Sequence, residues 1–158
     1  MQISSRLDFE ADPKTVYEMM TDKGWLTELV SRTGATSHTI DVAGPTTRID
    51  MALPAPSEVS KFVGSVLNLQ QVVEWGPAAA DGSREGTLSI TVPGLPVTMD
   101  GRAQMRPGGR GTVVDYSGDF QVRIPVMGKK IEQQASPYVK QAIDAQQEAG
   151  DDWIATRG

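Results

Sequence analysis

The chain of 158 residues is 39% hydrophobic and 22% charged, and its 15 Lys and Arg against 20 Asp and Glu give a net charge of −5. The absence of cysteine excludes thiolate metal sites, redox pairs and cysteine nucleophiles, and the single histidine excludes a metal site built from several histidines of one chain. The acidic balance and the aromatic content of only 6% argue against a nucleic-acid-binding module.

The beginning of the chain predicts one strand and two short helices. Residues 2–10 alternate between apolar and polar side chains, which is typical of a strand with one buried face. Asp12 and Pro13 supply an N-cap and a first-turn proline for one helix. A second helix is expected after Asp22, and Gly34 ends it.

A hydrophobic period of two predicts six further strands. They cover residues 38–42, 47–53, 67–75, 88–92, 97–106 and 114–124. Tight turns join most of them, whereas residues 76–86 are expected to form a mobile hairpin loop and residues 57–66 one irregular helical turn.

The last predicted element is an amphipathic helix from residue 127 to about residue 155, whose apolar stripe includes Ile131, Tyr138 and Ile143. Pro137 lies inside it and removes the backbone hydrogen bond to the carbonyl of Gln133. We therefore expect the helix to kink or to split in two at this position.

These elements predict an α+β fold in a single domain spanning residues 1–158. A seven-stranded antiparallel sheet would have the long helix on one face. Because a helix about 10 Å wide cannot cover so many strands, the sheet must curl around it, and such a curl tends to leave a space between them.

Two short segments add a family resemblance to this order of elements. Residues 12–17 (DPKTVY) follow the first strand, and residues 124–132 (IPVMGKKIE) lead into the long helix. With the element order they resemble the START-like superfamily, also called SRPBCC or the helix-grip fold, which includes birch-pollen-allergen-like proteins, polyketide cyclases and lipid-transfer domains. The likeness covers residues 2–155 and is nearest to an uncharacterised bacterial branch.

The resemblance implies a hydrophobic cavity between the sheet and the long helix. Members of the superfamily bind lipids, sterols, polyketides, hormones or client proteins, and only some are enzymes. Fold membership therefore leaves the function open.

Several side chains on the predicted inner face are candidates for lining this cavity. The apolar candidates are Met51, Trp75, Met99, Met105, Phe120 and Tyr138. Flexible thioethers suit a surface that adapts to differently shaped ligands, although ordinary core filling explains the same residues equally well. Gln71, Tyr116 and His38 are the polar candidates for orienting a ligand, because a polar group on an apolar wall needs a partner.

His38 is also the one side chain suited to act as a base near neutral pH. It shares a strand face with Ile40 and Val42, so it is expected to point inward. The alternative, which we favour, is a structural histidine, since no partner for nucleophilic or acid–base catalysis is identifiable.

The charged residues give weaker signals. The charged residues of the strands fall on the opposite face and are expected to form cross-strand pairs in water, not a catalytic carboxylate dyad. They are Arg48, Asp50, Asp100, Arg102, Asp115, Asp119 and Arg123. Lys129 and Lys130 at the start of the long helix are suited to an anionic head group, but they equally fit an ordinary exposed junction. The glycine-rich segments lack a nucleotide-binding pattern, so no cofactor is expected.

The sequence favours a binding or carrier protein for a hydrophobic small molecule or lipid. We expect access near the two short helices and the 54–66 loop. The alternatives are a polyketide cyclase- or dehydratase-like enzyme with His38 as its base and a protein-interaction module without a small ligand. No signal peptide and no long apolar run is found, so a cytoplasmic location without stable membrane insertion is expected.

Overall fold

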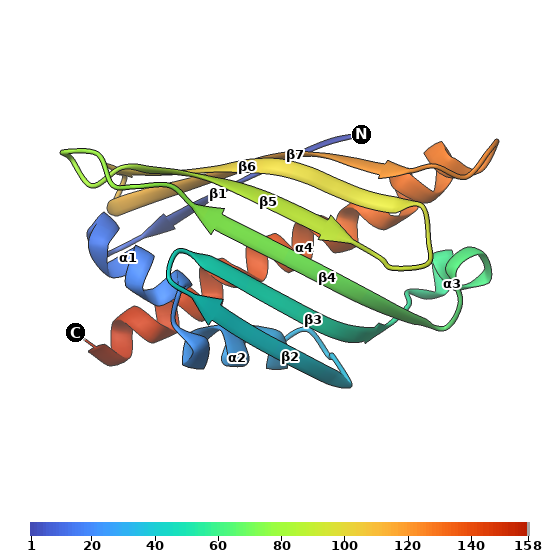
Figure 1. Ribbon diagram of the computed structural model, residues 1–158, viewed down its shortest axis with the longest axis horizontal. Helices are drawn as coiled ribbons and strands as arrows, with labels where there is room; N and C mark the ends of the chain where they lie inside the picture. The colour runs from blue at the N-terminus through green and yellow to red at the C-terminus, as the bar shows by residue number, and fades with distance from the viewer. Residues whose placement is uncertain (158) are drawn as a thin grey trace.

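Within residues 1–157, the part of the chain that the computed structural model describes, seven strands form one antiparallel sheet in the order β1-β7-β6-β5-β4-β3-β2. The strands are β1 (Gln2–Phe9), β2 (Ser37–Ala43), β3 (Thr46–Pro54), β4 (Val66–Trp75), β5 (Arg84–Thr91), β6 (Val97–Gly108) and β7 (Gly111–Val122). The helices are α1 (Pro13–Met20), α2 (Lys23–Ser31), α3 (Ser57–Val63) and α4 (Gly128–Arg157). The predicted fold class, a curled sheet around a long C-terminal helix, is confirmed (Figure 1).

The first two helices carry the chain from one edge of the sheet to the other. Asp12 accepts a hydrogen bond from the backbone N–H of Thr15 at 2.9 Å, and Asp22 accepts one from Trp25 at 2.9 Å, so both helices begin at the predicted caps. Because β1 and β2 lie at opposite edges, this connection passes beneath the end of the sheet (Figure 1).

A pair of opposed glycines helps the sheet to curl. Gly101 of β6 lies directly opposite Gly118 of β7 on the face toward α4. A Cβ atom at Gly101 would lie 2.9 Å from the Cα of Gly118, and one at Gly118 would lie 2.9 Å from the Cε of Met99. The sheet therefore bends where it carries no side chains.

Helix α4 packs against β1 and β7, and its ends lie near α2 and α3. Gln147 accepts a hydrogen bond from the backbone N–H of Asp8 at 2.8 Å and donates one to the carbonyl of Asp8 at 2.7 Å. One amide side chain thus satisfies both backbone groups of the exposed edge strand β1 at this residue. No helix within residues 1–157 is long and apolar enough to cross a membrane.

Of the two predicted outcomes at Pro137, a kink or a split, the structure excludes the split, because one helix continues from Gly128 to Arg157. Pro137 lacks the N–H that would reach the carbonyl of Gln133. The hydroxyl of Ser136 donates to that carbonyl at 3.3 Å instead, which compensates in part for the missing backbone bond. Residues 57–63 likewise differ from the prediction, because they form the regular helix α3 and not an irregular turn.

The outer face of the sheet carries charge pairs, as the alternation predicts. Arg6 and Asp115 lie opposite each other on β1 and β7, 2.8 Å apart, and Arg106 of β6 also binds Asp115. Arg48 and Asp50 pair at 3.1 Å within β3 and not across strands. These carboxylates are tied to arginines and do not form a dyad.

The carboxylate of Asp115 should make folding sensitive to acid. Partial burial disfavours its charged form, but Arg6 and Arg106 together outweigh burial and hold the pKa of Asp115 below its ordinary value. A lowered folded-state pKa stabilises the protein above the unfolded pKa, and this stabilisation is lost as the pH falls through the folded pKa. We expect the free energy of unfolding to fall below about pH 4 for this reason.

Chemical denaturation of Asp115→Asn between neutral and acid pH checks this expectation. The variant should be less stable than the wild type at neutral pH, and the difference should shrink in acid. Glu18→Gln, which removes an exposed carboxylate of α1, should keep the wild-type pH dependence. A constant difference between Asp115→Asn and the wild type at every pH would contradict the assignment.

Candidate functional site

The face of the sheet toward α4 is packed unevenly along the strands. At the end near α1 and α2, its side chains are buried; they include Leu7, Trp75, Ala103, Met105, Val114 and Tyr116. At the opposite end, beneath α3, the apolar side chains of the central strands are only half-buried; they are Met51, Leu53, Leu67, Leu69, Ile90 and Val97. The inner face is therefore fully covered at one end and only partly covered on β3, β4 and β5 at the other, where Met99, Phe120 and Val122 are nevertheless buried.

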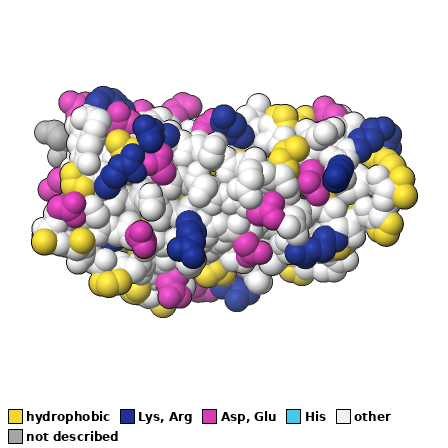
Figure 2. Space-filling view, turned by 90° about the horizontal axis from the view of Figure 1, so that it is seen from above, with side chains coloured by type: hydrophobic (Ala, Val, Ile, Leu, Met, Phe, Trp, Pro, Cys, Tyr) yellow, Lys and Arg dark blue, Asp and Glu magenta, His cyan; other side chains and the backbone are white. Residues whose placement is uncertain are grey.

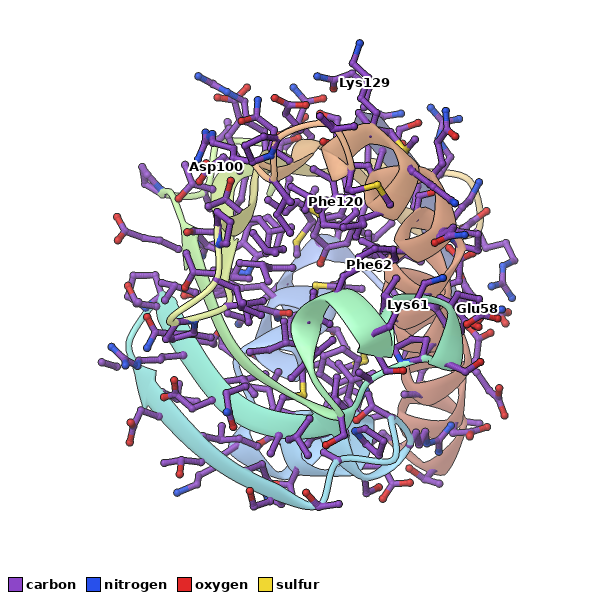
Figure 3. The ribbon with its side chains drawn as sticks, turned by 90° about the vertical axis from the view of Figure 1, so that its right-hand side faces the viewer. Glu58, Lys61, Phe62, Asp100, Phe120 and Lys129 are labelled. Carbon is purple, nitrogen blue, oxygen red and sulfur yellow. The ribbon has the colours of Figure 1, made fainter. Side chains whose placement is uncertain are left out.

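We call the partly covered end the α3-side interior. It consists of the six half-buried strand residues, of Phe62 and Val63 on α3, and of Ala135 and Val139 on α4. The register explains why they meet: Met51 lies opposite Leu69, and Leu53 opposite Leu67. Figure 3 looks onto this end and shows α3 between the curved sheet and α4, with Phe62 on the side of α3 that faces the fold. The position of α4 over β1 and β7 leaves the ends of β3 and β4 less covered.

Helix α3 is held over this interior by few contacts. Val59 is its one fully buried residue, and Pro56 at its N-cap provides no side-chain hydrogen bond. The hydroxyl of Tyr138 on α4 donates to Glu58 at 2.8 Å, and this bond raises the pKa of Tyr138. A short helix with so few attachments is expected to open at low cost in free energy.

Two polar side chains belong to the same end. Gln71 lies on the inner face of β4, opposite Ile49 and Ile90, and is half-buried. The Oε1 of Gln134 on α4 is buried and finds no hydrogen-bond partner within residues 1–157. A buried oxygen without a donor is costly, so it favours any molecule that brings a donor to it.

His38 lies opposite Met51, as the alternation predicts, but its side chain is exposed. It is the second residue of β2, an edge strand, and therefore has no neighbouring strand on one side. A depression of about 210 Å³ opens here, but most of its lining residues, such as Asp50, Ala52 and Asn68, belong to the outer face, and none comes from α3 or α4. The histidine thus lies outside the α3-side interior.

The structure divides the predicted site residues into three groups. The buried group, with at most 5% of the side chain exposed, consists of Trp75, Met99, Met105, Tyr116 and Phe120, which pack in the hydrophobic core. Met51 and Gln71 are half-buried on the inner face, and His38 and Tyr138 are exposed. Of the predicted site residues, only the half-buried pair lies on the partly covered part of the inner face.

Tyr116 uses its hydroxyl inside the protein. It donates to the Oε1 of Gln146 on α4 at 3.0 Å, and complete burial raises the pKa of Tyr116 well above its usual range. Tyr116→Phe should lower the free energy of unfolding by about 1–2 kcal/mol, because it leaves the amide oxygen of the half-buried Gln146 without its donor.

Urea denaturation measures this loss, and a second variant isolates its cause. Tyr116→Phe combined with Gln146→Met removes both polar groups and should recover much of the stability. Equal stability of Tyr116→Phe and the wild type would show that the hydrogen bond contributes nothing.

Sequence reasoning did not select Phe62, Ile90, Val97 or Gln134 for the site. Phe62 lies in a segment predicted to be irregular, and Gln134 is a polar residue of an amphipathic helix, so neither carried a signal. Ile90 and Val97 were assigned to inner strand faces, but alternation does not distinguish a tightly packed residue from a half-buried one.

A second, wider depression lies on the outer face of the sheet. It encloses about 490 Å³ and is lined by side chains such as Asp100, Arg102, Ser117 and Asp119 around the two opposed glycines. Its lining is polar and charged, so its chemistry differs from that of the α3-side interior.

Solved structures show that the chain has the helix-grip fold. The protein TTHA0849 from Thermus thermophilus is 15% identical, with a TM-score of 0.69 over 100% of this chain and 99% of that one. The Zhui aromatase/cyclase from Streptomyces sp. R1128 is 12% identical, with a TM-score of 0.69 over 99% of this chain and 94% of that one. Ara h 8.0201 is 13% identical, with a TM-score of 0.58 over 99% and 98%.

Within that class, the chain belongs to the family described as "Protein of unknown function (DUF2505)", whose profile matches residues 4–154. A comparison with curated proteins finds no significant match. At these identities the solved structures establish a shared fold, and the site must be argued from the residues of this chain.

Proposed function

We propose that the protein binds or carries a hydrophobic small molecule or lipid in the α3-side interior. The observation that carries this proposal is the change in burial along one sheet face. The same apolar alternation is buried toward α1 and only half-buried on the central strands beneath α3. Apolar surface left partly in water gains free energy when a ligand covers it, at about 25 cal/mol per Å².

Polar groups at this end are suited to orienting such a molecule. The Oε1 of Gln134, which has no partner within residues 1–157, is available to accept a hydrogen bond from a ligand, and the amide of Gln71 offers both a donor and an acceptor. A ligand with a long apolar body and one hydroxyl or amide group matches this arrangement, because few polar contacts fix orientation while apolar burial supplies affinity.

Access is proposed at the α3 end. Helix α3 has a single fully buried residue and one side-chain hydrogen bond to α4, through Glu58 and Tyr138. Helices α1 and α2 lie at the far end of the sheet, where the inner-face side chains are buried (Figure 1).

The direct experiment is to purify the protein from its native host and identify molecules released by organic solvent with mass spectrometry. We expect an apolar compound that is released reproducibly and competes with the neutral dye Nile red for the protein. A chain that releases no such compound and takes up no Nile red would contradict the proposal.

His38 separates this function from an enzymatic one. Because the side chain is exposed on the edge strand β2, His38→Ala should leave the affinity for Nile red within about twofold of the wild type, which corresponds to less than about 0.5 kcal/mol. Dye titration measures this. A large loss of affinity would instead place the imidazole in contact with the bound molecule and would favour a role in chemistry.

A further inference from the structure

The large hydrophobic side chains that water reaches gather at one end of the molecule. Those of residues 1–157 that are counted as exposed are Met1, Val66, Val126 and Tyr138. Val66 begins β4, Val126 lies in the loop between β7 and α4, and Tyr138 faces α3. All three belong to the α3 end (Figures 1 and 3).

Val126 has an unfavourable backbone conformation, and its side chain is exposed to solvent. Its φ angle is 69°, and the N–H of Met127 donates to the carbonyl of Pro125 at 2.8 Å, which closes a three-residue turn around it. A β-branched residue rarely adopts a positive φ, and the side chain of Val126 is 99% exposed. Backbone strain at a residue that contributes no packing to the fold suggests that the exposed side chain has a function, such as contact with a partner.

The same end is basic in an acidic protein. The segments 54–66, 92–98 and 122–131 contain Lys61, Arg123, Lys129 and Lys130 against the single carboxylate of Glu58, whereas the whole chain has a net charge of −5. Glu58 accepts the hydroxyl of Tyr138, and Glu132 binds the amino group of Met1 and the N–H of Val122. Figure 2 shows this end at the right, where hydrophobic side chains lie between Lys and Arg side chains.

We propose that this end docks onto a membrane surface that contains anionic phospholipids. Val126 would enter the boundary between head groups and acyl chains, while Lys129, Lys130 and the neighbouring basic residues lie at the level of the phosphates. Lysine is depleted in protein–protein interfaces, so isolated apolar side chains among lysines fit a lipid surface better than a protein partner. Docking does not depend on the proposed ligand, although both use the α3 end.

Vesicle flotation tests the proposal with the full chain. The wild type should bind vesicles of phosphatidylcholine mixed with phosphatidylglycerol, and should bind vesicles of phosphatidylcholine alone much more weakly. Lys129→Gln with Lys130→Gln should weaken binding to the mixed vesicles by about tenfold or more. Lys14→Gln with Lys23→Gln changes the net charge equally at the other end, on two exposed lysines, and should leave binding unchanged.

A third variant separates the role in docking from a role in folding. Val126→Asn places a residue that tolerates positive φ in the strained position, so its thermal stability should equal or exceed that of the wild type. Its binding to the mixed vesicles should nevertheless fall. The proposal is overturned if the wild type binds neither vesicle, if it binds both equally, or if the Lys14 and Lys23 variant loses as much binding as the Lys129 and Lys130 variant. If the protein binds no vesicles, a protein partner would be the alternative explanation for the exposed hydrophobic and basic side chains at this end.

Discussion

Replacing Leu69 by tryptophan is expected to lower the affinity for Nile red by at least about tenfold, which corresponds to about 1.4 kcal/mol. Leu69 is half-buried on the inner face of β4, opposite Met51 and beneath α3. A tryptophan there fills part of the α3-side interior and removes the space that the ligand would occupy. Because Leu69 is only half-buried, the larger side chain can extend toward solvent, and the free energy of unfolding should change little.

Val72→Trp is the matched control. Val72 lies on the same strand and is also half-buried, but its side chain points to the outer face of the sheet, opposite Arg48. This variant should keep the affinity of the wild type. Fluorescence titration of both variants decides the matter. Unchanged affinity in Leu69→Trp would show that the dye binds elsewhere, and equal losses in both variants would point to a general effect of the added indole.

Gly150→Ala should destabilise the protein by about 1–3 kcal/mol, although alanine favours a helix more than glycine does. Gly150 is buried where α4 crosses β1, and a Cβ atom there would press against the ring of Phe9, with its Cδ1 and Cζ atoms at 3.0 Å. Phe9 is itself 0% exposed, so its ring has no free space to move into. This contact sets how closely α4 can approach the sheet.

A double-mutant cycle with Phe9→Leu shows whether this contact is the cause. Phe9→Leu alone removes buried apolar surface and should destabilise the protein. In the double variant the smaller side chain makes room for the new methyl group, so the combined loss should be smaller than the sum of the single losses. Urea denaturation of the four proteins measures the coupling, and strictly additive losses would contradict the account.

The architecture follows from local patterns. Alternation at period two predicts the strands, and Asp12 with Pro13 and Asp22 predict the starts of α1 and α2. The order of elements then requires the long helix to cover a curled sheet. These patterns are local in the sequence, so they predict the helices and strands without knowledge of which elements pack together.

The partial burial of the side chains in the α3-side interior does not follow from such patterns. Leu69 and Val73 lie on the same face of β4 and carry the same sequence signal, yet Leu69 is half-buried and Val73 is buried. The difference follows the position along β4: Val73 lies toward the end of the sheet near α1 and α2, whereas Leu69 lies toward the short helix α3 (Figure 1). Contacts between residues distant in sequence decide which inner-face residues stay reachable.

The role of Tyr138 illustrates the same limit. Its position on the apolar stripe predicts an inward side chain, but its hydroxyl pairs with Glu58 on α3, and 41% of the residue remains exposed. The partner on α3 could not be foreseen, because residues 57–63 have only a proline before them and no side-chain cap to mark a helix. Short helices of this kind are formed by tertiary packing more than by propensity.

The most direct test of the proposed function is methyl NMR of the protein with and without Nile red. We predict chemical-shift changes at the methyl groups of the α3-side interior, above all Leu67, Leu69, Ile90 and Val97. The methyl groups of Leu7 and Val114, in the tightly packed half of the same sheet face, should change little. Saturating dye that leaves the first group unshifted, or that shifts both groups alike, would contradict the proposal that the α3-side interior is a binding site.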